Sequence, residues 1–156
     1  MATFYGTNST IANAITPATI LSPGLQGGNV RCMIDTYTVP DPATALVTGS
    51  LIHMGYTLPA GAKILFMRLH TTALGAGVTL NVGDAEDDNR YISAVDCSGA
   101  ITVFGPEAAE IDGSSYELDA SDSTALDTQI IVDVHNATTT LTADAEIILQ
   151  VFYTVE

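Results

Sequence analysis

Apolar and polar residues alternate along most of the chain after residue 30, and this pattern predicts β-strands. The closing stretch EIILQVFYTV has an apolar residue at every second position, and VTLNVG, from Val78 to Gly83, alternates with Thr79 and Asn81 outward. Successive side chains of a strand point to opposite sides of a sheet, so both stretches have one face suited to a core. The apolar face of the closing strand consists of Ile147, Leu149, Val151, Tyr153 and Val155.

Further strand-like stretches fill the chain between clusters of turn residues. In the strand predicted over Lys63–His70, Leu65, Met67 and Leu69 share one face, while Ile64, Phe66, Arg68 and His70 share the other. GPEAAEI is the one candidate for a turn or two of helix. About eight to ten short strands predict an all-β fold, either an antiparallel β-sandwich or a jelly-roll-like barrel. The remaining stretches are CMIDTYTV (Cys32–Val39), TALVTGSLIHM (Thr44–Met54), RYISAV, ITVF, SYEL and TQIIVDV, after which Asn136 is expected to begin a turn.

The first 30 residues contain no Asp, Glu, Lys or Arg, whereas the rest of the chain carries all the charges. A free soluble tail is usually charged, so we interpret residues 1–30 as an extended N-terminal arm that lies on another surface. The alternative is an irregular first strand of the domain. The predicted division is therefore an arm, 1–30, and a β-sandwich domain, 31–156. The apolar residues expected to make the arm's contacts, with its own domain, a sister subunit or a different protein, are Phe4, Tyr5, Ile11, Ile15, Ile20, Leu21 and Leu25.

The charge balance narrows the possible partners. The 156 residues include 18 acidic and four basic ones, for a net charge of −14, which disfavours binding to nucleic acid or to an anionic membrane surface. No apolar run approaches the roughly 20 residues of a membrane helix. No basic segment opens the chain, so we expect a protein made in the cytoplasm and not secreted. Cys32 and Cys97 are interpreted as small buried hydrophobes and not as a disulfide.

No sequence motif of catalysis is present. His53, His70 and His135 lie far apart and lack the spacing of metal ligands. The chain has no Trp and few other aromatic residues, which weakens a carbohydrate-binding or glycosidase interpretation. We therefore predict no enzymatic activity, no cofactor and no small-molecule substrate. A β-sandwich hydrolase would require the histidines to cluster with a carboxylate.

The stretch NVGDAEDDNRYIS is the best candidate for a binding site. Asp84, Glu86 and Asp88 alternate as at the start of an EF-hand loop, but Asn89 stands where glycine is required, and Val95 stands where glutamate is required. Another kind of calcium loop remains open. We favour a structural turn in which Arg90 forms an ion pair with Asp84 or Asp88.

The segment LPAGAKILFMRLHTTALGAGVTLNVGDAEDDNRYISA, from Leu58 to Ala94, resembles the capsid decoration or cement proteins of tailed bacteriophages. The resemblance implies a β-sandwich or jelly-roll subunit, assembled as a homotrimer on the outer surface of an icosahedral virion. Such a subunit binds the major capsid protein and stabilises the shell by bridging adjacent capsid subunits. It has no catalytic residue to carry over.

Two other interpretations stay open. One is a calcium-stabilised β-sandwich adhesion or receptor-binding module, such as a fibre or spike tip, with Asp84, Glu86 and Asp88 as ligands. The other is a structural role in the phage tail or neck, because those parts also use small β modules.

Overall fold

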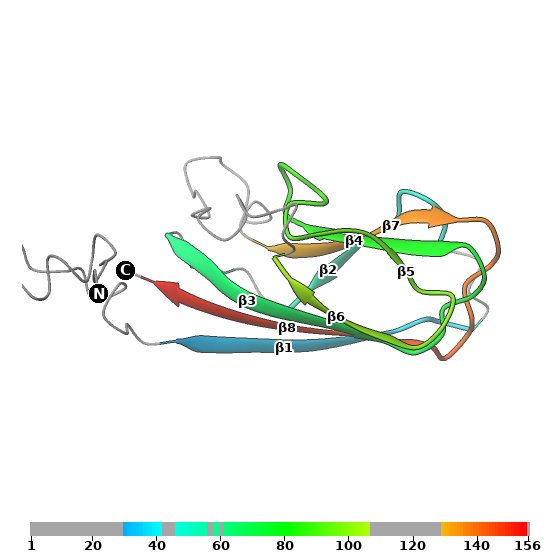
Figure 1. Cartoon of the computed structure of the whole chain (residues 1–156), viewed down its shortest axis with the longest axis horizontal. Coiled ribbons are helices and arrows are strands. Elements are labelled where there is room, and N and C mark those ends of the chain that lie inside the picture. The colour runs from blue at the N-terminus through cyan, green and yellow to red at the C-terminus, as the bar shows by residue number, and fades with distance from the viewer. Residues whose placement is uncertain (1–29, 42–45, 56–57, 60, 107–128, 156) are drawn as a thin grey trace, which may run out of the picture.

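The computed structural model describes residues 30–41, 46–55, 58–59, 61–106 and 129–155. In this part of the chain all regular structure is β, and eight strands form two four-stranded sheets (Figure 1). The strands are β1 (Arg31–Thr38), β2 (Leu51–Met54), β3 (Ala62–Thr71), β4 (Val78–Gly83), β5 (Ile92–Asp96), β6 (Ile101–Gly105), β7 (Ile130–Ala137) and β8 (Glu146–Val155).

The chain passes repeatedly from one sheet to the other. One sheet has the order β1-β8-β3-β6, and the second has the order β2-β7-β4-β5, with antiparallel pairing throughout. We call them the first and the second sheet. Figure 1 shows them as two layers that face each other along the length of the molecule. The predicted all-β antiparallel sandwich is confirmed.

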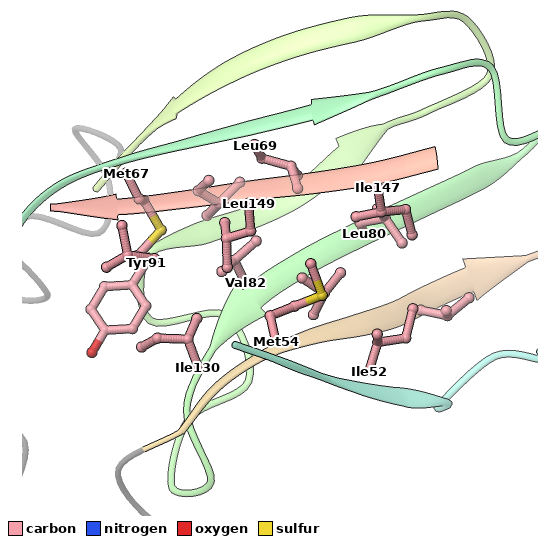
Figure 2. Close-up of a cluster of buried hydrophobic side chains, with 14 of the residues drawn as sticks. Ile52, Met54, Met67, Leu69, Leu80, Val82, Tyr91, Ile130, Ile147 and Leu149 are labelled. Atoms are coloured by element: carbon pink, nitrogen blue, oxygen red, sulfur yellow. The ribbon is translucent and has the colours of Figure 1, made fainter. Parts of the chain in front are cut away.

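The core lies between the two sheets and is made by the inward residues of the alternating strands. In β8, Ile147, Leu149 and Val151 are fully buried, as the alternation predicted. Figure 2 shows Ile147 and Leu149 close to residues of the opposite layer, among them Leu80 and Val82 of β4. Burial of this continuous apolar layer is the main force that holds the two sheets together.

The predicted faces of β3 are wrong at its start. The pairing of β3 with β8 shifts register between Ile64 and Phe66, so Leu65 is an extra residue in a β-bulge. Ile64 is consequently buried, and Leu65 is 47% exposed. Beyond the bulge, Met67 and Leu69 point into the core as predicted. A sequence with apolar residues at both Ile64 and Leu65 does not reveal which of them the bulge turns outward.

Other differences concern strand lengths and one cysteine. β2 covers only Leu51–Met54, because Thr48 and Gly49 form a turn in which Gly49 has a φ of +81°. β7 continues through Asn136 to Ala137, where the sequence predicted a turn. Cys97 is buried, but Cys32 is exposed on the outer side of β1, and both thiols are free. The interpretation of Cys32 as a buried residue is therefore wrong.

Several predictions fall outside the described residues. The arm, with its contact residues from Phe4 to Leu25, is one of them, and the first described strand begins at Arg31. The SYEL strand and the helical candidate beyond Pro106 are also outside the described ranges. Among the residues that are described, no helix is long and apolar enough to span a membrane.

Candidate functional site

The acidic loop, Asp84–Arg90, connects β4 to β5 and is organised around one carboxylate. Asp84 is only 1% exposed. Its Oδ1 accepts hydrogen bonds from the backbone N–H groups of Glu86 and Asp87, both at 3.1 Å. The backbone N–H of Asp84 in turn donates to the carbonyl of Asp87 at 2.9 Å. This is an Asx-type turn, in which a side chain satisfies the backbone of a tight loop.

Two side chains donate hydrogen bonds to the other carboxylate oxygen of Asp84, Oδ2. Arg90 Nε donates to Oδ2 at 2.7 Å, and the hydroxyl of the fully buried Tyr91 donates to the same atom at 3.2 Å. The Arg90 guanidinium also reaches Glu86 at 3.4 Å. Asp84 is thus the partner of Arg90 in this structure, while the side chain of Asp88 is exposed. The burial and the charge-assisted bonds make this a structural clamp.

A cation at this loop would compete with the clamp. Both oxygens of Asp84 already accept protein donors, so binding calcium there would require Arg90 to leave. Within the ranges that the structure describes, no group of three or more His, Cys, Asp or Glu side chains is arranged to hold a metal ion. The geometry of the loop favours a structural turn over a calcium site.

The acidic loop also lies against the end of β4. A Cβ atom on Gly83 would collide with the backbone of Asp87 and Asp88, so only glycine permits this close approach. The loop is therefore held by its backbone as well as by the Asp84 clamp.

A second buried carboxylate lies on the outer side of the second sheet. Asp133 of β7 is 3% exposed and pairs in register with Asn81 of β4, and its Oδ1 has no hydrogen-bond partner. Burial raises the pKa of Asp133, the negative charge of Asp88 raises it further, and His135 acts in the opposite direction. Sequence analysis missed this residue, because an acid at an outward strand position is normally solvated.

The three histidines do not form a cluster. His70 lies on β3 of the first sheet, where its Nδ1 is 2.9 Å from the Thr102 hydroxyl. His53 and His135 lie on β2 and β7 of the second sheet, and His135 Nδ1 is 3.3 Å from the Asn81 amide. The constellation that a hydrolase would require is therefore not assembled from them.

The outer face of the first sheet carries a row of aromatic side chains. Phe66 of β3 stacks on Phe104 of β6 with ring centroids 5.5 Å apart, and it packs at a tilt against Phe152 of β8 with centroids 5.8 Å apart. Phe66 is 40% exposed, and Phe104 is 55% exposed. We call Phe66, Phe104 and Phe152 the aromatic row. Alternation had placed Phe66 opposite Met67 and Leu69, but nothing in the sequence showed that three distant strands would align their phenylalanines.

The aromatic row is bordered by polar and apolar groups. Ile34 on β1 is 60% exposed on the same side of the sheet. Beside the row is a shallow hollow lined by Arg68, His70, Ile148 and Gln150. The outer face of the first sheet thus presents exposed aromatic side chains beside a hollow that Arg68 helps to line. Exposed apolar patches of this kind often mark contact surfaces.

Comparisons with known proteins indicate where this fold occurs. No protein-family model and no curated protein sequence matches the chain. Its structure, however, is similar to a chain of the cyanophage Pam1 capsid asymmetric unit, with a TM-score of 0.61 and 23% identity over 93% of this chain and 96% of that chain. It is also similar to a chain of the capsid of Ralstonia phage GP4, with a TM-score of 0.62 and 20% identity over 94% of each.

The fold is one found in phage capsids. Both matches cover nearly the full length of both chains, so the similar chains are of about the same size as this one. At 20–23% identity the likeness concerns the fold.

Proposed function

We propose that this chain is a structural protein of a phage virion, which binds the outer surface of an icosahedral capsid and stabilises the shell by bridging adjacent capsid subunits. The observation that carries the proposal is the similarity of fold, over almost the entire chain, to chains of two phage capsids. The sequence resemblance of Leu58–Ala94 to capsid decoration proteins supports the same role independently.

The described residues suit a structural role that needs no catalytic or metal-binding group. They bring together no metal-binding group, and His70 lies on the other sheet from His53 and His135. Asp84 is hydrogen-bonded to Arg90 and Tyr91, and these contacts hold the acidic loop in place. Catalysis, a cofactor and a small-molecule substrate are accordingly not part of the proposal.

The strand order supports a jelly-roll form of the sandwich. Eight strands divide into two sheets of four, and the chain changes sheet at every connection except the one from β4 to β5. Each sheet pairs strands that are distant in sequence, such as β1 with β8 and β2 with β7. This interleaving is the arrangement of a two-sheet jelly roll, an architecture common in viral capsid domains.

The proposed attachment uses residues 1–30. β1 is an edge strand of the first sheet and begins at Arg31, so the segment joins the domain at the margin of a sheet. An uncharged segment with apolar residues such as Phe4, Ile11 and Leu25 is suited to lie along the major capsid protein, with backbone hydrogen bonds and small pockets providing affinity. A homotrimer would present three such arms, and avidity would strengthen the attachment.

The test is the occupancy of phage shells that lack this protein. The full chain is expected to bind them and to raise the temperature at which they rupture, whereas a chain lacking residues 1–29 should bind far less while it remains folded. In a full-length control, serine replaces the seven apolar arm residues, which separates apolar contact from mere length. The proposal is overturned if the full chain does not bind the shells, or if truncation leaves the occupancy unchanged.

A further inference from the structure

In the described part of the chain the two sheets have four edge strands, and three of these are short or irregular. β2 has four residues and β6 has five. The pairing of β5 with β4 shifts register between Leu80 and Val82, and Ala94 of β5 has a φ of +49°. Shortness and bulges are ordinary means by which a sheet edge is protected from pairing with another chain. β1 is the exception, because its eight residues pair with β8 in one unbroken register.

The free edge of β1 presents backbone hydrogen-bonding groups. Val39, just after β1, donates its N–H to the carbonyl of Ala145, which is the next position in the register of β1 with β8. Successive residues of an antiparallel strand direct these groups to opposite sides, so Cys32, Ile34 and Thr36 turn theirs away from β8. Within the described ranges no strand pairs with this edge, and Figure 1 shows β1 at the margin of its layer.

Two opposite charges lie on β1. Arg31 is exposed, and it forms no ion pair with any residue that the structure describes. Asp35 is half-buried, and its carboxylate accepts the N–H of Thr36 at 2.8 Å and also that of Gly55. Both donors are neutral backbone groups, so no cation among the described residues balances the charge of Asp35. The contact with Thr36 also occupies one N–H of the free edge.

We propose that the free edge of β1 is a docking site for the same strand of a second copy of this chain, paired antiparallel about a two-fold axis at Met33. Arg31 of one copy would then lie opposite Asp35 of the other, twice by symmetry. Cys32 would lie opposite Ile34, and each such pair would exchange both of its N–H···O bonds. Ile34, which is 60% exposed, would be partly covered by the neighbouring strand. The inference adds to the proposed virion role a contact between copies that continues one sheet into the next.

Charge and hydrogen bonding favour this register over its neighbours. An axis at Ile34 would require the N–H of Thr36, which already donates to a carboxylate. An axis at Asp35 would bring two like charges together, and an axis one residue before Met33 would leave the charges unpaired. The axis at Met33 pairs them at a non-hydrogen-bonded position, where side chains of two strands lie closest. A two-fold contact occupies the same edge of both copies and no other strand, so it can coexist with the proposed homotrimer.

The first test is sedimentation equilibrium of the full chain, without any capsid. The wild type should form dimers, and Ile34→Lys should raise the dissociation constant about tenfold, because a cation at a sheet edge opposes strand pairing. Leu65→Lys is the matched control, since Leu65 is also exposed on the first sheet but lies on the inner strand β3. Arg31→Glu should likewise weaken the dimer, whereas Arg68→Glu on β3 makes the same change of net charge and should not. Circular dichroism of each variant checks that the domain is folded.

Disulfide trapping tests the register. One chain is the wild type, with its exposed thiol at Cys32, and the other carries Cys32→Ser and Ile34→Cys. With the axis at Met33, neither chain should form disulfide dimers with itself, whereas their mixture in a glutathione redox buffer should form mixed dimers. A mixture of the wild type with a chain that carries Cys32→Ser and Leu65→Cys measures the disulfides formed by chance encounters. Cys97 is buried and is present in every chain, so it does not bias the comparison.

The proposal is overturned if the wild type stays monomeric up to about 1 mM, or if Ile34→Lys and Leu65→Lys have the same effect. It is also overturned if the mixed chains give no more disulfide dimers than the control mixture. Disulfide dimers of either chain with itself would place the axis at another residue and refute the register. Loss of the dimer on deletion of residues 1–29, with no effect of Ile34→Lys, would overturn the proposal and assign the contact to those residues. Because no shell is present, none of these results depends on whether the chain binds a capsid.

Discussion

Replacing Asp84 with alanine should strongly destabilise the domain, because this buried carboxylate organises the whole acidic loop. It accepts Arg90 Nε at 2.7 Å and the Tyr91 hydroxyl at 3.2 Å. It also accepts two backbone N–H groups of the loop at 3.1 Å. Alanine removes the acceptor of all these donors, and of a second Arg90 contact at 3.4 Å, at a position that is 1% exposed.

The loss of stability depends on which of the former hydrogen-bond donors to Asp84 can be solvated by water in the variant. The Tyr91 hydroxyl is fully buried and is left without this acceptor, at a cost of about 1–2 kcal/mol. The Arg90 side chain is 17% exposed, so it recovers part of its solvation and costs about 1–2 kcal/mol. The loop N–H groups lie nearer the surface and add little. The total is about 3 kcal/mol, or a fall in melting temperature of roughly 6–12 °C for a domain of this size.

The assay is thermal and urea unfolding of the full chain, followed by circular dichroism. Asp88→Ala is the matched control, because Asp88 is an exposed acid of the same loop and its loss should cost no more than about 0.5 kcal/mol. Tyr91→Phe should show the hydroxyl contribution by itself, at about 1 kcal/mol.

Calcium separates the structural clamp from the adhesion-module alternative. A loop held by Arg90 predicts that millimolar calcium leaves the melting temperature of the wild type unchanged. A calcium site predicts a rise that both Asp84→Ala and Asp88→Ala abolish. The clamp reasoning fails if Asp84→Ala lies within about 1 kcal/mol of the wild type, or if Asp88→Ala is equally damaging.

Two further predictions concern buried titratable groups. The folded-state pKa of Asp133 is raised, mainly by burial. Stability is therefore lost as the pH rises through that pKa and the buried carboxyl becomes charged. Asp133→Asn should consequently raise the melting temperature at pH 7. That difference should shrink as the pH falls below about 4, where the wild-type carboxyl is protonated in the unfolded chain as well, and a difference that is constant from pH 3 to 8 would contradict the cause. Burial also raises the pKa of the Cys97 thiol to about 11, so at pH 8 only about one molecule in a thousand carries this thiolate. Ellman's reagent should therefore label the exposed Cys32 quickly and Cys97 only on unfolding, and a Cys32→Ser variant that still shows a fast thiol would refute this.

The sequence alone was sufficient for the fold class and for most strands. In β8 and β4 an apolar residue at every second position defines the core face, because a strand between a core and solvent has a period of two. Both faces were predicted as the structure has them, with Leu149 and Leu80 inward. The sequence also identified Arg90 as a partner for the acids of its loop, because a turn of six residues keeps them within reach of one another.

The tertiary structure alone decided the features that depend on strands distant in sequence. The bulge at Leu65 arises from pairing with β8, and the burial of Asp133 on an outward strand position could not be read from the alternation. From the sequence, Arg90 could pair with either Asp84 or Asp88. In the structure it pairs with Asp84, which also accepts a hydrogen bond from the buried Tyr91.

The aromatic row shows most clearly what the pattern of a single strand does not determine. Phe66, Phe104 and Phe152 are separated by tens of residues, and they meet because β3 lies between β6 and β8. Alternation tells which side of its own strand a residue occupies, but it contains no information about which strand lies beside it. The order and register of the strands are set by packing of the whole core, and only they bring the three phenylalanines together on one face.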